Sequence, residues 1–162
     1  MVTVSPPKSE ASPSWAYVLQ LPHDRCAPRI ARVTLRAVLA GHGLTGLTDT
    51  AELVTSELVT NAYRHTTGPA TLRLRALAGA RLRVSVWDAN PHIPPPFDKR
   101  PGPPHPVHPV HAEADGGRGL FLVCHYADAW GGYLFGGGLF GRGGKLLWCE
   151  IGPHAADRVA AA

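Results

Sequence analysis

The chain has 162 residues, of which 44% are hydrophobic, and a formal net charge of +4 from 16 Lys and Arg against 12 Asp and Glu. This length and composition are typical of one globular domain that buries a core without cross-links. The cysteines Cys26, Cys124 and Cys149 form no CxxC pair, which excludes a disulfide framework and a zinc site of the usual spacing. We therefore expect a reducing, cytoplasmic compartment. No signal peptide or apolar run of about 18 residues is found, and the basic residues are scattered, so neither a membrane nor direct nucleic-acid binding is expected.

The N-terminal third predicts a tail, a strand and a helix. Residues 1–14 are rich in Pro, Ser and charge and are expected to be a disordered tail. The aromatic and β-branched run 15–21 predicts a strand that ends at Pro22. A helix is predicted over 27–40, with its apolar face formed by Ile30, Val33, Ala37 and Val38. Its arginines Arg29, Arg32 and Arg36 are expected to form a solvated stripe.

The strongest helical signal lies at 49–65. Asp49 precedes Glu52 by three residues, which resembles a capping box. The apolar stripe of this helix consists of Ala51, Val54, Leu58 and Ala62. We therefore expect this helix to pack on the core.

Two alternating runs, 70–77 and 81–88, predict an antiparallel hairpin that turns at residues 78–80. Its arginines are expected to point outward. A long loop follows over about 91–115, because nine of the sixteen prolines lie between Pro91 and Pro109. The loop is expected to have no apolar face that would hold it in place.

The last third predicts a short helix over 119–126 and strands over 129–135 and 145–151, joined by a glycine-rich turn. The element order favours an α+β fold, a two-layer α/β sandwich in which a mixed, mostly antiparallel sheet carries helices on one face. We expect a single domain over 15–152 and a C-terminal tail over 153–162.

Polar residues and a glycine cluster that suit an anion site follow one another along the chain. Glu57 and Asn61 are four residues apart and share one face of the 49–65 helix. Taken alone, this spacing favours two solvated side chains, and it is the residues downstream that point to a site. Asp88 ends a predicted strand. The glycines Gly116, Gly117 and Gly119 open the last helix, whose free N–H groups and dipole favour an anion such as phosphate.

The ordered motifs resemble the GHKL superfamily of ATP-binding domains, and within it the anti-sigma-factor serine kinases of actinobacteria. SELVTNAYRHT (56–66) resembles the N box, WDAN (87–90) the first glycine box and GGRGLFLV (116–123) the second. GGKLLWCEI (143–151) is similar to the closing strand of the family. The resemblance implies the Bergerat fold, in agreement with the architecture expected above, and makes the 91–115 loop an ATP lid.

The resemblance also implies roles for individual residues. Asn61 would hold Mg²⁺, Glu57 would be the general base, and Asp88 would accept a hydrogen bond from the adenine amino group. The remaining nucleotide contacts would come from Asn90, which stands where the family has a glycine, and from Gly117, Arg118, Gly119 and Leu120. Leu146 would stand where the family often has a threonine that helps to recognise adenine.

The function implied by the resemblance is transfer of the ATP γ-phosphate to a serine or threonine of a protein partner, with ATP and Mg²⁺ as cofactors. An anti-sigma-factor antagonist and a sigma factor would be the partners, and a homodimer is implied. The alternative is a catalytically weak or inactive module that regulates transcription through protein contacts. Histidine kinase activity is disfavoured because no long helical hairpin carries an acceptor histidine, and hydrolysis is the weakest rival.

Overall fold

The computed structural model describes residues 15–99, 118–135 and 143–153. The elements in chain order are β1 (Ala16–Leu21), α1 (Ala27–Gly41), the 3-10 turn η1 (Thr45–Leu47), α2 (Thr48–His65), β2 (Ala70–Leu77), β3 (Arg81–Asp88), α3 (Arg118–Tyr126), β4 (Ala129–Phe135) and β5 (Gly144–Ile151). Every helix and strand predicted from the sequence is present, with bounds that differ by about one residue. The predicted tail 1–14, nearly all of the tail 153–162, and residues 100–115 of the predicted loop lie outside the described residues.

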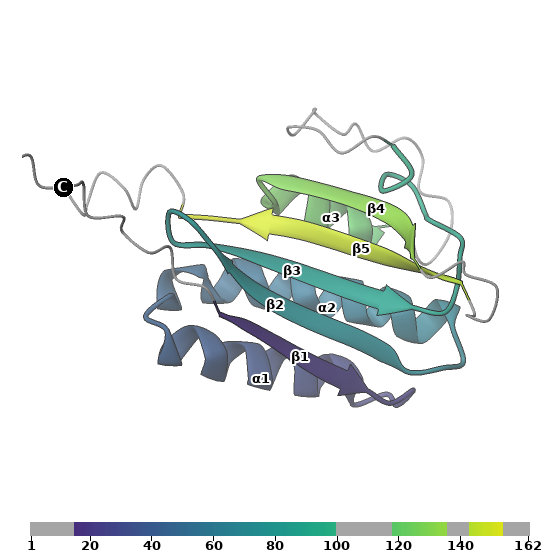
Figure 1. Ribbon diagram of the computed structural model, residues 1–162, viewed down its shortest axis with the longest axis horizontal. Coiled ribbons are helices and arrows are strands. Elements are labelled where there is room, and N and C mark those ends of the chain that lie inside the picture. The colour runs from purple at the N-terminus through teal and green to yellow at the C-terminus, as the bar shows by residue number, and fades with distance from the viewer. Residues whose placement is uncertain (1–14, 100–117, 136–142, 154–162) are drawn as a thin grey trace, which may run out of the picture.

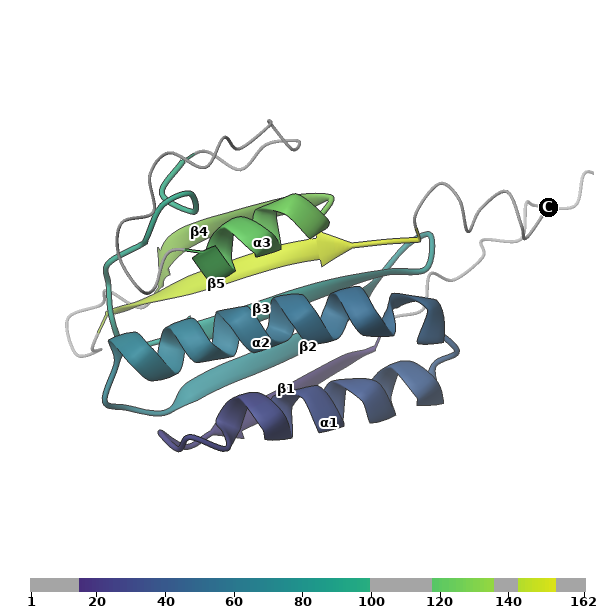
Figure 2. The same ribbon diagram turned by 180° about the vertical axis from the view of Figure 1, so that it is seen from behind.

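The five strands form one sheet in the order β1-β2-β3-β5-β4, and each neighbouring pair is antiparallel. The three α-helices of the described residues cover one face of this sheet, and none of them lies on the opposite face (Figures 1 and 2). The helix α2 lies between α1 and α3 and packs against both. The α+β sandwich expected from the element order is therefore confirmed. No helix of the described ranges is long and apolar enough to cross a membrane.

The alternation of side chains along the strands explains how the sheet forms the core. On β2 and β3, every second residue is buried under the helices, and the arginines between them are partly or fully exposed on the other face, as predicted. Two cysteines are buried in this core, Cys124 on α3 and Cys149 on β5. Burial raises the pKa of the Cys124 thiol to about 12 and also raises the pKa of Cys149. Both thiols are therefore protonated at neutral pH.

The helix α1 is present where the sequence predicts it, but it buries a different face. Ile30 and Val33 of the predicted apolar face are 50% and 56% exposed. The buried residues are instead Ala27, Ala31, Leu35 and Leu39. Both sets fit a helical period, and the small alanines allow α1 to pack closely on its neighbours.

Two further expectations are wrong, one about the cap of α2 and one about the arginines of α1. The residue before α2 is Leu47, and no side chain caps this helix end, so the predicted capping box is wrong. Glu52 instead accepts a hydrogen bond from Arg36 Nε at 2.6 Å, and Arg32 donates to Ser56 Oγ at 2.6 Å. The arginine stripe therefore links two helices and is not wholly solvated.

The start of the predicted proline-rich loop packs against the core. Phe97 is completely buried, and Ile93 is partly buried against the core cluster. A turn holds this segment, because the Phe97 N–H donates to the Pro94 carbonyl at 2.9 Å. The expectation that this loop offers no apolar anchor is therefore wrong for residues 93–97.

Candidate functional site

The candidate site lies at one end of the sandwich, where α2 and β3 end and where α3 and β5 begin (Figure 2). The amphipathic pattern of α2 buries its apolar stripe and places the polar residues of its last turns beside the first turn of α3. A small pocket opens between the two helices. Its lining residues are Glu57, Thr60, Asn61, Arg64, His65, Gly119 and Leu120.

Asn61 presents a buried acceptor that no group of the described chain satisfies. Its side chain is 7% exposed, and its Oδ1 is buried without a hydrogen-bond partner in the described part of the chain. A buried acceptor of this kind costs about 1–3 kcal/mol unless a donor or cation satisfies it. Amide oxygens are among the ligands that Mg²⁺ accepts. The site therefore fits a magnesium ion held by Asn61.

Glu57 lies one helical turn before Asn61 and reaches the first turn of α3. A Cβ atom added to Gly119 would lie 1.9 Å from Glu57 Oε2 and 2.9 Å from its Cδ, so any larger residue at this position would push the carboxylate aside. The free N–H groups at a helix N-terminus favour a negative charge there. The predicted anion site thus already contacts a carboxylate of the chain itself.

Asp88 and Asn90 form the second half of the site, at the end of β3. Asp88 is buried, and the Asn90 backbone N–H donates to its Oδ1 at 2.9 Å. The Asn90 side chain donates from Nδ2 to the carbonyl of His65, the last residue of α2, at 2.9 Å. Asn90 therefore ties the end of β3 to the helix that carries Glu57 and Asn61.

The most consequential residue that sequence reasoning missed is Lys145. Its side chain is 1% exposed, and its Nζ donates to Asp88 Oδ1 at 2.8 Å. Because side chains alternate along β5, Lys145 shares the helix-covered face with Leu147, whereas Leu146 points to the opposite face. Leu146, which stands where the family often has a threonine, therefore points away from the face that carries Asp88. Alternation along β5 places Lys145 on the buried face, but its pairing with Asp88 also requires the strand order, which the sequence alone does not state.

Of the other predicted site residues, only some lie at the pocket. Leu120 is buried at the pocket, beside Gly119. Arg118, one of the predicted nucleotide contacts, is exposed as the first residue of α3. Gly117 lies outside the described residues. The structure thus brings together Glu57, Asn61, Gly119 and Leu120, with Asp88 and Asn90 joined to them through His65.

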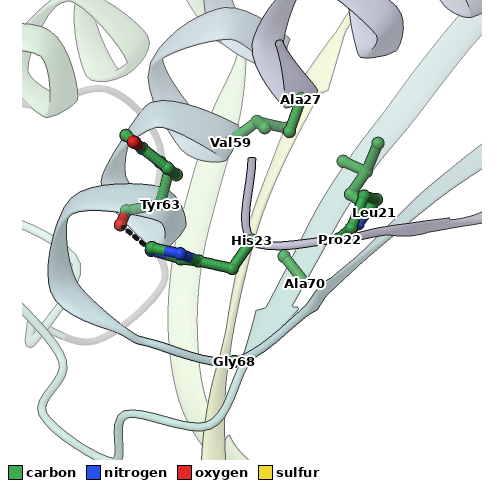
Figure 3. Close-up of a pocket in the computed structure, with 8 residues that line it drawn as sticks. All are labelled: Leu21, Pro22, His23, Ala27, Val59, Tyr63, Gly68 and Ala70. Atoms are coloured by element: carbon green, nitrogen blue, oxygen red, sulfur yellow. Dashed lines mark hydrogen bonds between the residues drawn. The ribbon is translucent and has the colours of Figure 1, made fainter. Parts of the chain in front are cut away.

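A second hollow lies between β1, α1 and α2 and is separate from these residues. His23 stacks on the ring of Tyr63 and hydrogen-bonds from Nε2 to the Tyr63 carbonyl at 3.0 Å (Figure 3). Its walls are otherwise mostly apolar, with Leu21 and Val59 among them. This arrangement packs the loop after β1 onto α2 and contributes no group to the candidate site.

Comparison with protein families agrees with this geometry. The family model described as Histidine kinase-like ATPase domain matches residues 23–133, which is more than half of the chain. The chain therefore belongs to this family, and the GHKL superfamily expected from its motifs is confirmed. No curated protein matches the chain. The matched range includes α2, β3 and α3 and ends before β5, which carries Lys145. The class of protein is thus an ATP-binding domain of the histidine kinase-like type.

Proposed function

We propose that the chain is a regulatory protein kinase of the anti-sigma-factor type, which transfers the γ-phosphate of ATP to a serine or threonine of a protein partner. The observation that carries the proposal is the unpartnered, buried Oδ1 of Asn61 beside the carboxylate of Glu57. Phosphoryl transfer depends on positioning and charge neutralisation, for which a metal ligand and a base suffice. An antagonist of the anti-sigma factor would be the substrate, and a sigma factor the second partner.

In this proposal each residue has a distinct task. Magnesium, when bound, neutralises charge on the transferring phosphate. Asn61 holds that ion, and Glu57 takes the proton of the attacking hydroxyl. Asp88 accepts a hydrogen bond from the adenine amino group, and the first turn of α3 at Gly119 borders the phosphates.

The experiment that tests the proposal uses ATP labelled in its γ-phosphate. The full chain is incubated with Mg²⁺, labelled ATP and an anti-sigma-factor antagonist from the same genome, and label on the antagonist is measured. A control antagonist whose acceptor serine is replaced by alanine must stay unlabelled. Nucleotide binding without transfer to any such antagonist contradicts the kinase assignment.

A binding module without kinase activity is the second candidate. The observation that favours it is the contact between Glu57 and Gly119, because a carboxylate at the first turn of α3 competes with a phosphate group for the same N–H groups. In this alternative, nucleotide is a structural ligand, and regulation acts through protein contacts alone. The transfer assay separates the two candidates.

Binding of Mg-ADP is expected to stabilise the folded chain. A ligand that binds only the native state at 100 times its dissociation constant adds about 2.7 kcal/mol to the free energy of unfolding. Urea unfolding with and without saturating Mg-ADP measures this difference. An unchanged midpoint at millimolar Mg-ADP contradicts nucleotide binding.

Replacing Asn61 by alanine is expected to abolish the magnesium dependence of nucleotide affinity. The variant removes the amide oxygen that would ligate the ion, so ADP should bind equally with Mg²⁺ or with EDTA. Calorimetric titration under both conditions measures the effect. Thr50→Ala, on the first turn of α2 and outside the pocket lining, serves as a matched control and should keep the magnesium dependence. An Asn61→Ala protein that keeps it would remove Asn61 from the metal site.

A further inference from the structure

The pair of Asp88 and Lys145 is a buried ion pair at the end of the sheet. The two residues face each other in the register of β3 and β5, and their side chains are 2% and 1% exposed. Removing two charges from water costs several kcal/mol per ion, which offsets much of their mutual attraction. Stability alone is therefore a weak reason for a lysine at this position.

The hydrogen bonds around the pair fix one oxygen of the Asp88 carboxylate. Oδ1 accepts from Lys145 Nζ at 2.8 Å and from the Asn90 backbone N–H at 2.9 Å. Lys145 Nζ also donates to the Asn90 carbonyl at 3.3 Å, so the three residues form a closed ring. The other oxygen, Oδ2, takes part in none of the hydrogen bonds within residues 15–99, 118–135 and 143–153.

Close packing holds this ring in place. A Cβ atom added to Gly144, the residue before Lys145, would lie 2.2 Å from the Asp88 carbonyl and 2.9 Å from the ring of Trp87. Glycine at this position therefore lets β5 approach β3 where the lysine enters the core. The orientation of the carboxylate is set by the hydrogen bonds that Lys145 and Asn90 donate to Oδ1.

We propose that Lys145 is a positioning residue for nucleobase recognition. Together with the Asn90 N–H it occupies Oδ1 and leaves Oδ2 as the acceptor for an exocyclic amino group. This inference rests on the proposed nucleotide site, and it selects adenine. In a base with a carbonyl group at the same place, such as hypoxanthine, the carbonyl oxygen would face Asp88 Oδ2. Both atoms are acceptors, so no hydrogen bond could form. Sites built to pair with a donor reject analogues that lack it.

The test compares the affinities of the full chain for Mg-ADP and Mg-IDP, which differ by an amino group against a carbonyl. The original chain should prefer ADP by at least about tenfold. In Lys145→Met the carboxylate loses its partner, so ADP affinity should fall and the ADP-to-IDP preference should approach one. Lys99→Met, at an exposed lysine of the described chain, is the matched control and should keep the preference.

A second variant separates positioning from folding. Lys145→Gln keeps the test possible if Lys145→Met does not fold. Its uncharged side chain can still donate an N–H to Oδ1, so this variant should keep part of the preference for ADP. If Lys145 has a purely structural role, both variants will have a lower melting temperature but an unchanged preference for ADP. That result would overturn the inference about Lys145 and leave the proposed function standing. An original chain that binds neither nucleotide would overturn the proposed function as well.

Discussion

Replacing Glu57 by glutamine is expected to lower the rate of phosphoryl transfer by about 10² to 10⁴, the usual contribution of a general base. Glutamine keeps the shape of the side chain and its contact with Gly119, but it cannot accept the proton of an attacking hydroxyl. Nucleotide affinity should change little, because Asn61 and Asp88 are untouched. Single-turnover transfer of labelled phosphate to the antagonist measures the rate, and calorimetry measures the affinity.

The matched control for this change is Glu52→Gln. Glu52 lies on the same helix but pairs with Arg36 on α1, away from the pocket, so transfer should proceed at the original rate. Circular dichroism of both variants checks that α2 remains folded. A Glu57→Gln protein that transfers phosphate as fast as the original chain would make Glu57 a packing residue of α3, and the kinase mechanism proposed above would be wrong.

The elements with strong local signals were predictable from the sequence. The hairpin of β2 and β3 combines strict alternation with a short turn, where Gly79 adopts a positive φ of 74°. The helix α2 has one continuous apolar stripe, and its four predicted core residues are all buried. In such segments local propensity and tertiary packing agree, so periodicity alone gives the correct face.

The choice of face on α1 was not predictable in the same way. Its sequence carries two apolar stripes of helical period, one with Ile30 and Val33 and one with Leu35 and Leu39. Hydrophobicity favours neither strongly. The buried face of α1 is decided by contacts with residues distant in sequence. In the observed orientation Arg32 and Arg36 reach polar groups of α2, and the alanines of α1 face inward. Long-range contacts of this kind leave no signal within a short window.

The candidate site also combines residues that local sequence predicts with residues that only long-range contacts bring together. Glu57 and Asn61 could be paired from their helical spacing, and the pocket contains both. The buried pair of Lys145 and Asp88 joins residues 57 positions apart, and it requires the strand order β3-β5, which the sequence does not state. A lysine beside glycines in a strand sequence is ordinarily expected to be exposed. Its burial follows from the register.

Phe97→Ala is expected to lower the free energy of unfolding by about 3–5 kcal/mol, the usual cost of removing a buried aromatic ring. Phe97 is fully buried although it lies outside every helix and strand. A Cβ atom on Gly132 of β4 would lie 3.1 Å from the Phe97 carbonyl and 2.9 Å from Ile93, so this segment rests directly on the sheet. Urea unfolding monitored by circular dichroism measures the loss.

The matched control is Phe135→Ala, which removes the same ring from a position that is 55% exposed at the end of β4. A surface change of this kind should alter the free energy of unfolding by no more than about 0.5 kcal/mol. The two variants therefore differ in burial and not in chemistry. If Phe97→Ala cost as little as Phe135→Ala, residues 93–97 would not pack on the core in solution. The start of the predicted lid would then have no apolar anchor, as the sequence first indicated.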